Sequence, residues 1–151
     1  MIAKTSALFC LMIVLYAFKS STTNAVKSNT NTYNLTVEAK GIRAQKGYIE
    51  FALYNDPEVY AEVGKTYKQI RKKVAGTNAS CTFENVPEGT YALCIYHDEN
   101  NNNKCDQNFL GIPTEGYGFS NDIKPVISVP TFEECSVILD KPLSVTIDLI
   151  Y

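Results

Sequence analysis

The sequence contains no tryptophan and a single histidine, His97. A zinc centre needs several nitrogen or sulfur ligands, so one histidine without a neighbouring ligand cluster does not indicate zinc. The chain also lacks a Gly-x-Ser-x-Gly elbow, a Walker loop and an HExxH helix, which are sequence signatures of common hydrolases and nucleotide-binding proteins. We therefore interpret His97 as a residue at the end of a strand with a local hydrogen bond.

An excess of charge of one sign is also missing. The chain has 14 Lys and Arg against 16 Asp and Glu, a formal net charge of −2, so it lacks the basic footprint of a nucleic-acid-binding protein. The basic run at residues 65–73 is mixed with apolar residues and is interpreted as a solvated face. With 151 residues, of which 45% are hydrophobic, the chain suits one domain with a packed core.

A long apolar run occurs at the N-terminus, from Ser6 to Phe18 behind Lys4. The run is too short to span a bilayer comfortably, and small residues follow it up to Ala25, as in a secretory signal. We expect a signal peptide at residues 1–25, a flexible leader at 26–32 and a single domain at 33–151. The protein would then be secreted and extracellular, or periplasmic or envelope-bound in a bacterium, without a membrane span after cleavage. An uncleaved anchor is the alternative.

Removal of the signal leaves four cysteines: Cys81, Cys94, Cys105 and Cys135. An even number of cysteines in an exported chain predicts two disulfides, although sequence does not choose among the three possible connectivities. Free buried thiols are the alternative. Asn34 and Asn78 begin glycosylation sequons, which matter only in a host that glycosylates its secreted proteins.

Alternation of apolar and polar residues predicts an all-β fold. Strands are expected at residues 33–39, 48–55, 79–86, 90–97, 135–140 and 143–151. Residues 58–74 are ambiguous, and we expect a short helical piece near 57–62 followed by irregular or strand structure. Tyr91 follows a Pro-Glu-Gly turn, as does the tyrosine of the tyrosine corner in immunoglobulin-like domains. These features indicate a small antiparallel β-sandwich with one short helical insertion.

The stretch HDENNNNKCDQN (residues 97–108) contains oxygen-bearing side chains at alternate positions. Counted from Asp98, this is the D-x-[DN]-x-[DN] order of an EF-type calcium loop, in which position seven contributes its backbone carbonyl. The predicted ligands of a structural Ca²⁺ are Asp98, Asn100, Asn102, Lys104 and Asp106. The alternative is a solvated, Asn-rich turn.

Two positions depart from the EF-type pattern. Position six is Asn103 instead of glycine, but asparagine tolerates the left-handed backbone that this position needs. Position twelve is Phe109 instead of a bidentate glutamate, so Glu115, Glu99 or water would have to complete the coordination. With few carboxylates, the expected dissociation constant is weak, on the order of 10⁻⁴–10⁻³ M.

The segment GIPTEGYGFSND (residues 111–122) combines three glycines with Tyr117 and Phe119. It is either a ligand-binding surface or a packed loop that braces the calcium loop. We favour the bracing role, because aromatic side chains in compact loops usually pack.

Five motifs stand out along the chain: GYIEFALYN at 47–55, F-x-x-V-P-x-G-x-Y-A at 83–92, HDEN at 97–100, GIPTEGYGFSN at 111–121 and I-x-L-x-Y at 147–151. Together they resemble a bacterial family of secreted or envelope proteins known as domain of unknown function 2141. The resemblance covers residues 33–151, although the family usually has glycine where Asn101 and Asn103 stand, and the extra cysteines are unusual for it. It implies an exported β-sandwich similar to transthyretin-type or carboxypeptidase-regulatory modules, without a known activity. Together with the tyrosine corner, the expected sandwich is immunoglobulin-like or transthyretin-like.

The function we expect is that of a secreted, calcium-stabilised β-sandwich, not an enzyme, that acts as a binding or structural module. Its partner would be an unknown extracellular or cell-surface ligand. The alternative is a small transthyretin-like hydrolase with its site near His97, Asp98 and Glu115. Convergence of these three side chains in an open cleft would favour the hydrolase, and a His97 packed beneath residues 111–122 would favour the module.

Overall fold

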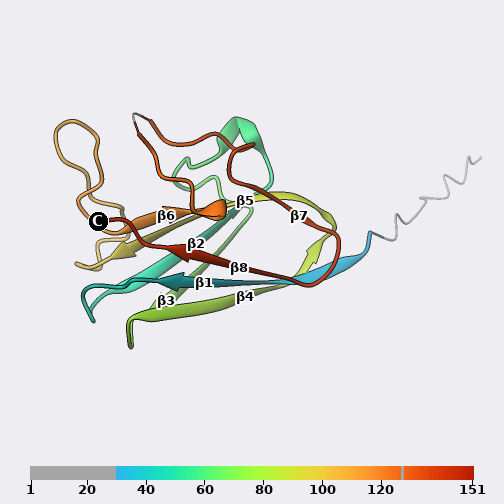
Figure 1. Cartoon of the computed structure of the whole chain (residues 1–151), viewed down its shortest axis with the longest axis horizontal. Coiled ribbons are helices and arrows are strands. Elements are labelled where there is room, and N and C mark those ends of the chain that lie inside the picture. The colour runs from blue at the N-terminus through green and yellow to red at the C-terminus, as the bar shows by residue number, and fades with distance from the viewer. Residues whose placement is uncertain (1–29, 127) are drawn as a thin grey trace, which may run out of the picture.

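The computed structural model describes residues 30–126 and 128–151, which form two β-sheets (Figure 1). The three-stranded sheet has the order β4-β1-β8 and consists of β1 (Thr32–Lys40), β4 (Asn78–Pro87) and β8 (Leu143–Asp148). The five-stranded sheet has the order β3-β2-β5-β6 and consists of β2 (Tyr48–Tyr54), β3 (Lys68–Lys73), β5 (Gly89–Asp98) and β6 (Tyr117–Phe119), with β7 (Ser136–Leu139) also paired to β5. The predicted β-sandwich is confirmed.

The pairing of the strands is antiparallel except in one ladder. β1 and β8 run parallel, with Val37 opposite Val145, whereas β1 and β4 are antiparallel. The ambiguous segment after residue 57 consists of a short 3-10 helix, η1 (Pro57–Val59), followed by strand β3, and a second 3-10 turn, η2 (Ser120–Asp122), follows β6. The predicted helical insertion is therefore a single 3-10 turn.

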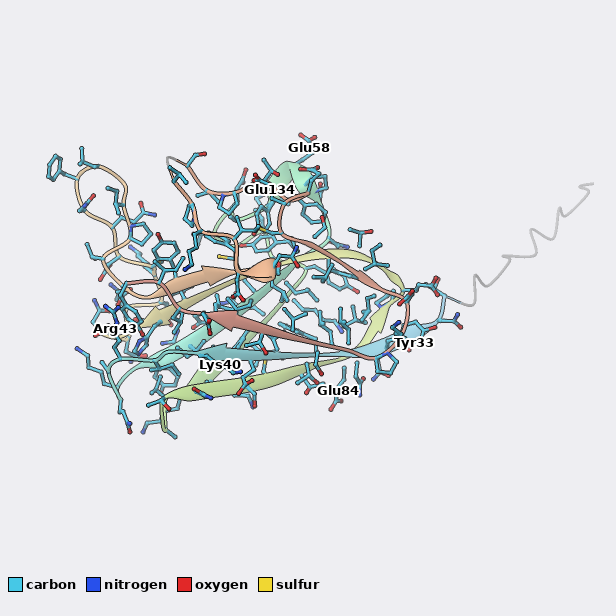
Figure 2. All side chains as sticks on the ribbon, in the orientation of Figure 1. Tyr33, Lys40, Arg43, Glu58, Glu84 and Glu134 are labelled. Carbon is cyan, nitrogen blue, oxygen red and sulfur yellow. The ribbon has the colours of Figure 1, made fainter. Side chains whose placement is uncertain are left out.

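The main core lies between the two sheets. Inward-facing residues alternate along each strand, so Leu35, Val37 and Ala39 of β1 and Ile49, Phe51 and Leu53 of β2 are fully buried. β4 and β5 contribute Phe83, Val86, Leu93 and Ile95 to the same cluster. Figure 2 shows Tyr33 and Arg43 toward opposite ends of the molecule, so β1 runs along the length of the sandwich.

The outer face of the five-stranded sheet has an apolar half and a charged half. Ala52, Tyr54 and Ala92 form a second apolar cluster, which Phe132 and Cys135 complete from the segment before β7. Glu58 and Glu134, labelled in Figure 2, lie in the two segments that cover this half. Farther along the same strands, Glu50, Arg71 and Asp98 form the charged half. The charged half of the outer face therefore adjoins the predicted calcium loop, which begins at Asp98.

Tyr91 forms the predicted tyrosine corner. Its ring is buried, and its hydroxyl donates a hydrogen bond to the carbonyl of Pro87 at 2.9 Å. The bond ties β5 to the end of β4 across the turn at Glu88. This turn is one of the local features that the sequence predicted correctly.

The predicted disulfides are not present in the part of the chain that the structure describes. Cys81, Cys94, Cys105 and Cys135 are all free thiols. Cys81 faces the core between the sheets, whereas Cys94 and Cys135 belong to the apolar cluster on the outer face. The even cysteine count was thus a wrong guide here, because Cys81, Cys94 and Cys135 fill apolar packing positions.

The predicted signal peptide (residues 1–25) and most of the predicted leader lie outside the described residues. Strand β1 begins at Thr32, next to the predicted start of the domain at residue 33. Within residues 30–126 and 128–151, no helix has both the length and the apolar character that a membrane-crossing segment requires.

Candidate metal centre

Asp98 is the last residue of β5, and its side chain is fully buried at the start of the Asn-rich loop. The carboxylate accepts backbone N–H bonds from Asn102 at 3.0 Å and from Asn103 at 2.9 Å. It also accepts a bond from the Arg71 guanidinium at 2.8 Å. Asp98 therefore organises the first turn of the loop and is already ion-paired.

Two asparagines continue the same pattern along the loop. The side-chain oxygen of Asn100 accepts from the N–H of Asn102 at 3.1 Å, and that of Asn102 accepts from the N–H of Lys104 at 2.9 Å. Asn101 and Asn103 both adopt left-handed backbone angles, with φ of 62° and 63°. The prediction that Asn103 would take over the glycine conformation is confirmed, and Asn101 does the same.

Asp106 closes the loop against the two amides. Its carboxylate accepts bonds from the amide nitrogen of Asn100 at 2.6 Å and from that of Asn102 at 2.9 Å. Four of the predicted ligand side chains, counting Asp98, are thus gathered in one loop. For Lys104 the backbone N–H makes the bond to Asn102, and Phe109, the residue at position twelve, points into solvent.

Glu115 fastens the base of the loop. Its side chain is buried, and its two carboxylate oxygens accept the N–H groups of Glu99 at 2.9 Å and of Asp106 at 3.0 Å. Glu99 itself pairs with Lys46 at 3.1 Å. Glu115 therefore joins the first and last turns of the loop, whereas Glu99 is directed to a lysine.

Arg71 of β3 connects the residues of the charged half of the outer face. It pairs with Glu50, which lies directly opposite it on β2, and with Asp98, and it donates to Asn101 at 2.7 Å. Its guanidinium carbon lies 4.2 Å from the centre of the Tyr48 ring. Burial raises the pKa of Asp98, but the bonds from Arg71 and from the N–H groups at 103 and 102 outweigh it and lower that pKa below its ordinary value.

His97 points to the opposite face of β5, because consecutive strand residues alternate. The ring is fully buried, with one nitrogen 2.8 Å from the carbonyl of Lys46 and the other 2.9 Å from the Tyr151 hydroxyl. A carbonyl only accepts, so Nε2 carries a proton, and in the neutral ring Nδ1 then accepts from the Tyr151 hydroxyl. His97 and Asp98 therefore do not converge, and Glu115 is bonded to the loop backbone.

Of the segment predicted to brace the loop, residues 111–122, Glu115 bonds to the loop and residues 116–119 pack against the sandwich. Gly116 lies against the Tyr151 ring so closely that an added Cβ would sit 2.5 Å from a ring carbon. Its carbonyl accepts the N–H of His97 at 2.7 Å, and Tyr117 exchanges backbone bonds with Ile150. The preceding residues behave differently, because Phe109, Leu110 and Ile112 are exposed.

The donor set of the loop suits a hard cation in kind, because carboxylate and amide oxygens are calcium ligands. Each of the oxygens on Asp98, Asn100 and Asn102 that accepts one N–H has a second lone pair. Among the described residues, no group of three or more His, Cys, Asp or Glu side chains is arranged for a metal ion. An ion here would therefore depend on the amides, which would have to turn their oxygens inward beside Asp106.

Cys105 is a free thiol beside these side chains. Burial, followed by the charges of Glu115, Asp106 and Asp98, raises the pKa of its thiol to about 11. Calcium prefers oxygen to sulfur ligands, so the candidate ligands are the oxygens of the loop and not this thiol.

Sequence reasoning missed Arg71 and Glu50. Arg71 was assigned to a solvated basic face, whereas it is half-buried and paired. A signal was present in YIEFALY (48–54), where Glu50 interrupts an otherwise apolar strand. A buried carboxylate needs a partner, so Glu50 implied a cation on a neighbouring strand.

Comparison with known proteins gives a family but no characterised relative. No curated protein and no solved structure matches the chain. One family model, described as an uncharacterized protein conserved in bacteria (DUF2141), matches residues 37–146, which include the loop and all strands except the start of β1 and the end of β8. The chain belongs to this family.

Proposed function

We propose that this protein is a secreted, non-enzymatic β-sandwich module whose loop at residues 98–106 binds Ca²⁺. The observation that carries the proposal is that Asp98, Asn100, Asn102 and Asp106 lie together in one hydrogen-bonded loop, with the amide groups of Asn100 and Asn102 on the Asp106 carboxylate. Asn101 and Asn103 adopt left-handed backbone angles between these alternate residues. In EF-type calcium loops the ligands come from alternate residues, and here the two amides would turn their oxygens toward the ion.

The proposed role of the ion is structural. Asp106 and Asp98 are the two carboxylates of the set, and Arg71 already neutralises Asp98, so the affinity is weak. With a dissociation constant of about 0.1 mM, calcium at about 1 mM adds about 1.4 kcal/mol to the free energy of unfolding. A contribution of this size stabilises the loop in a calcium-rich medium. The affinity is too weak for a cytosolic calcium sensor.

Two further points support a module and not an enzyme. The His97 ring is buried with both nitrogens bonded, and Asp98 lies on the other face of β5. A general base must reach the proton that it removes, and His97 has no path to a substrate. The proposal of export rests on residues 1–25 alone, because the free cysteines give it no support.

Thermal unfolding of the chain from Val26 onward tests the calcium proposal. Calcium at about 1 mM is expected to raise the melting temperature by roughly 5 °C relative to a chelator. Asp106→Asn removes one carboxylate and should abolish this rise, whereas Asp140→Asn, at an exposed position outside the loop, should keep it. An equal response of both variants, or no rise in the wild type, would refute the proposal.

A further inference from the structure

The connection between β5 and β6 projects as a rounded loop that stands away from both sheets (Figure 1). Its outermost part exposes three apolar side chains: Phe109 is 95% exposed, Leu110 68% and Ile112 53%. Large apolar side chains gathered on a protruding segment are uncommon in a protein that stays in water, and they mark contact sites. We call residues 107–114 the apolar tip.

Four backbone N–H groups of the apolar tip are bonded within the tip itself. The side-chain oxygen of Asn108 accepts the N–H groups of Leu110 at 2.9 Å and Ile112 at 3.1 Å. The N–H of Asn108 donates to the Ile112 carbonyl, and that of Gly111 to the Asn108 carbonyl, both at 2.9 Å. Pro113 has no N–H to satisfy. The tip therefore exposes few backbone donors that need water.

The apolar tip carries no charge, since none of its residues, QNFLGIPT, is Asp, Glu, Lys or Arg. Its base is rigid, because Thr114 donates to the Asp106 carbonyl at 2.7 Å and a β-bridge joins Gln107 to Pro113. Asp106 is held in turn by Glu115 at 3.0 Å. Apolar side chains are thus presented on a fixed, uncharged support.

We propose that the apolar tip inserts Phe109, Leu110 and Ile112 into the interfacial region of a lipid bilayer. A bilayer penalises backbone polar groups that are not bonded internally, and the bonds of Asn108 satisfy the N–H groups of Leu110 and Ile112. The tip is convex and narrow, so it suits a deformable apolar medium better than a flat protein surface. The inference goes beyond the calcium site, because none of the tip's bonds uses a side chain proposed as a calcium ligand.

The absence of tryptophan from the chain gives a direct reporter. Phe109→Trp introduces a single tryptophan at the tip, and Val63→Trp introduces one at a residue that is 91% exposed near η1. Both are made in the chain from Val26 onward, which keeps every strand and both apolar clusters. The probes are vesicles of phosphatidylcholine and vesicles of phosphatidylethanolamine with phosphatidylglycerol, both in a chelator.

Insertion predicts that the emission of Phe109→Trp shifts to shorter wavelength with vesicles and is quenched by lipids brominated on the acyl chains. The emission of Val63→Trp should not change. The contacts are apolar and the net charge is −2, so phosphatidylcholine should bind at least as well as the anionic mixture, with little effect of salt. Leu110→Ser added to Phe109→Trp should weaken vesicle binding about tenfold.

Three outcomes would overturn the proposal. The first is an unchanged Phe109→Trp emission with both kinds of vesicle, and the second is an equal shift at Val63→Trp, which would mean general adsorption. The third is a shift of the Phe109→Trp emission that grows with protein concentration in the absence of lipid, which would identify the tip as a protein contact. Because the vesicles are tested in a chelator, failure of the calcium proposal leaves these outcomes unaffected.

Discussion

Replacement of Arg71 by methionine should destabilise the protein strongly. Methionine keeps much of the apolar stem but removes the charge that joins Glu50 to Asp98, and both of these side chains are almost completely buried. Breaking a buried ion pair by removal of one partner costs about 3–5 kcal/mol, because a buried charge is left uncompensated. Since Arg71 itself is partly exposed, we expect the lower end, about 3 kcal/mol at pH 7.

Urea denaturation measures this loss as a lower transition midpoint with an unchanged slope. Asp98→Asn in the Arg71→Met background removes one uncompensated charge and should restore part of the stability. The deficit of Arg71→Met should also shrink as the pH falls toward 4, because Asp98 without its guanidinium partner protonates more readily. A loss below about 1 kcal/mol, or a deficit that does not change with pH, would refute the reasoning.

Three further predictions concern the residues around the loop. The pKa of Asp98 is lowered in the folded state, so the ionised carboxylate stabilises the fold above its unfolded pKa of about 3.9. This stabilisation is lost as the pH falls through the folded pKa. The free energy of unfolding should therefore fall less steeply with acidification in Asp98→Asn than in the wild type, as measured by denaturation at a series of pH values. Tyr151→Phe leaves Nδ1 of His97 without a donor and should cost about 1–2 kcal/mol in chemical denaturation. Gly47→Ala places a Cβ 2.0 Å from the carbonyl oxygen of Asp98 at a φ of +68°, so we expect a fall in melting temperature that Gly76→Ala, with open space around it, does not produce.

The strands and the tyrosine corner could be predicted because their signals are local. The alternation in residues 33–39 and 48–55 matches β1 and β2, and the turn before Tyr91 fixes the bond to Pro87. Strand β6 was not expected, because its three residues carry no periodicity and pair only through β5 and Ile150. The parallel pairing of β1 with β8 was not expected either, since a sequence pattern does not encode strand direction.

The candidate calcium loop could be predicted only in part, because only some of its interactions are local in the sequence. The spacing of Asp98, Asn100, Asn102 and Asp106 is a local feature, and the structure brings these side chains together. The pairing of Asp98 with Arg71 joins residues 27 positions apart, and no local pattern indicates it. The disulfides failed because counting cysteines carries no information on which side of a sheet each thiol lies.

The most direct test of the calcium loop is a calcium titration of the chain from Val26 onward, followed by amide NMR. Calcium binding at the loop predicts saturating shifts concentrated at Asn102, Asn103 and Lys104, whose N–H groups bond to the proposed ligands. The fitted dissociation constant should lie on the order of 10⁻⁴–10⁻³ M, and Asp106→Asn should remove the shifts. Amide signals that do not move in calcium at about ten times this range, or that move equally in Asp106→Asn, would contradict the account.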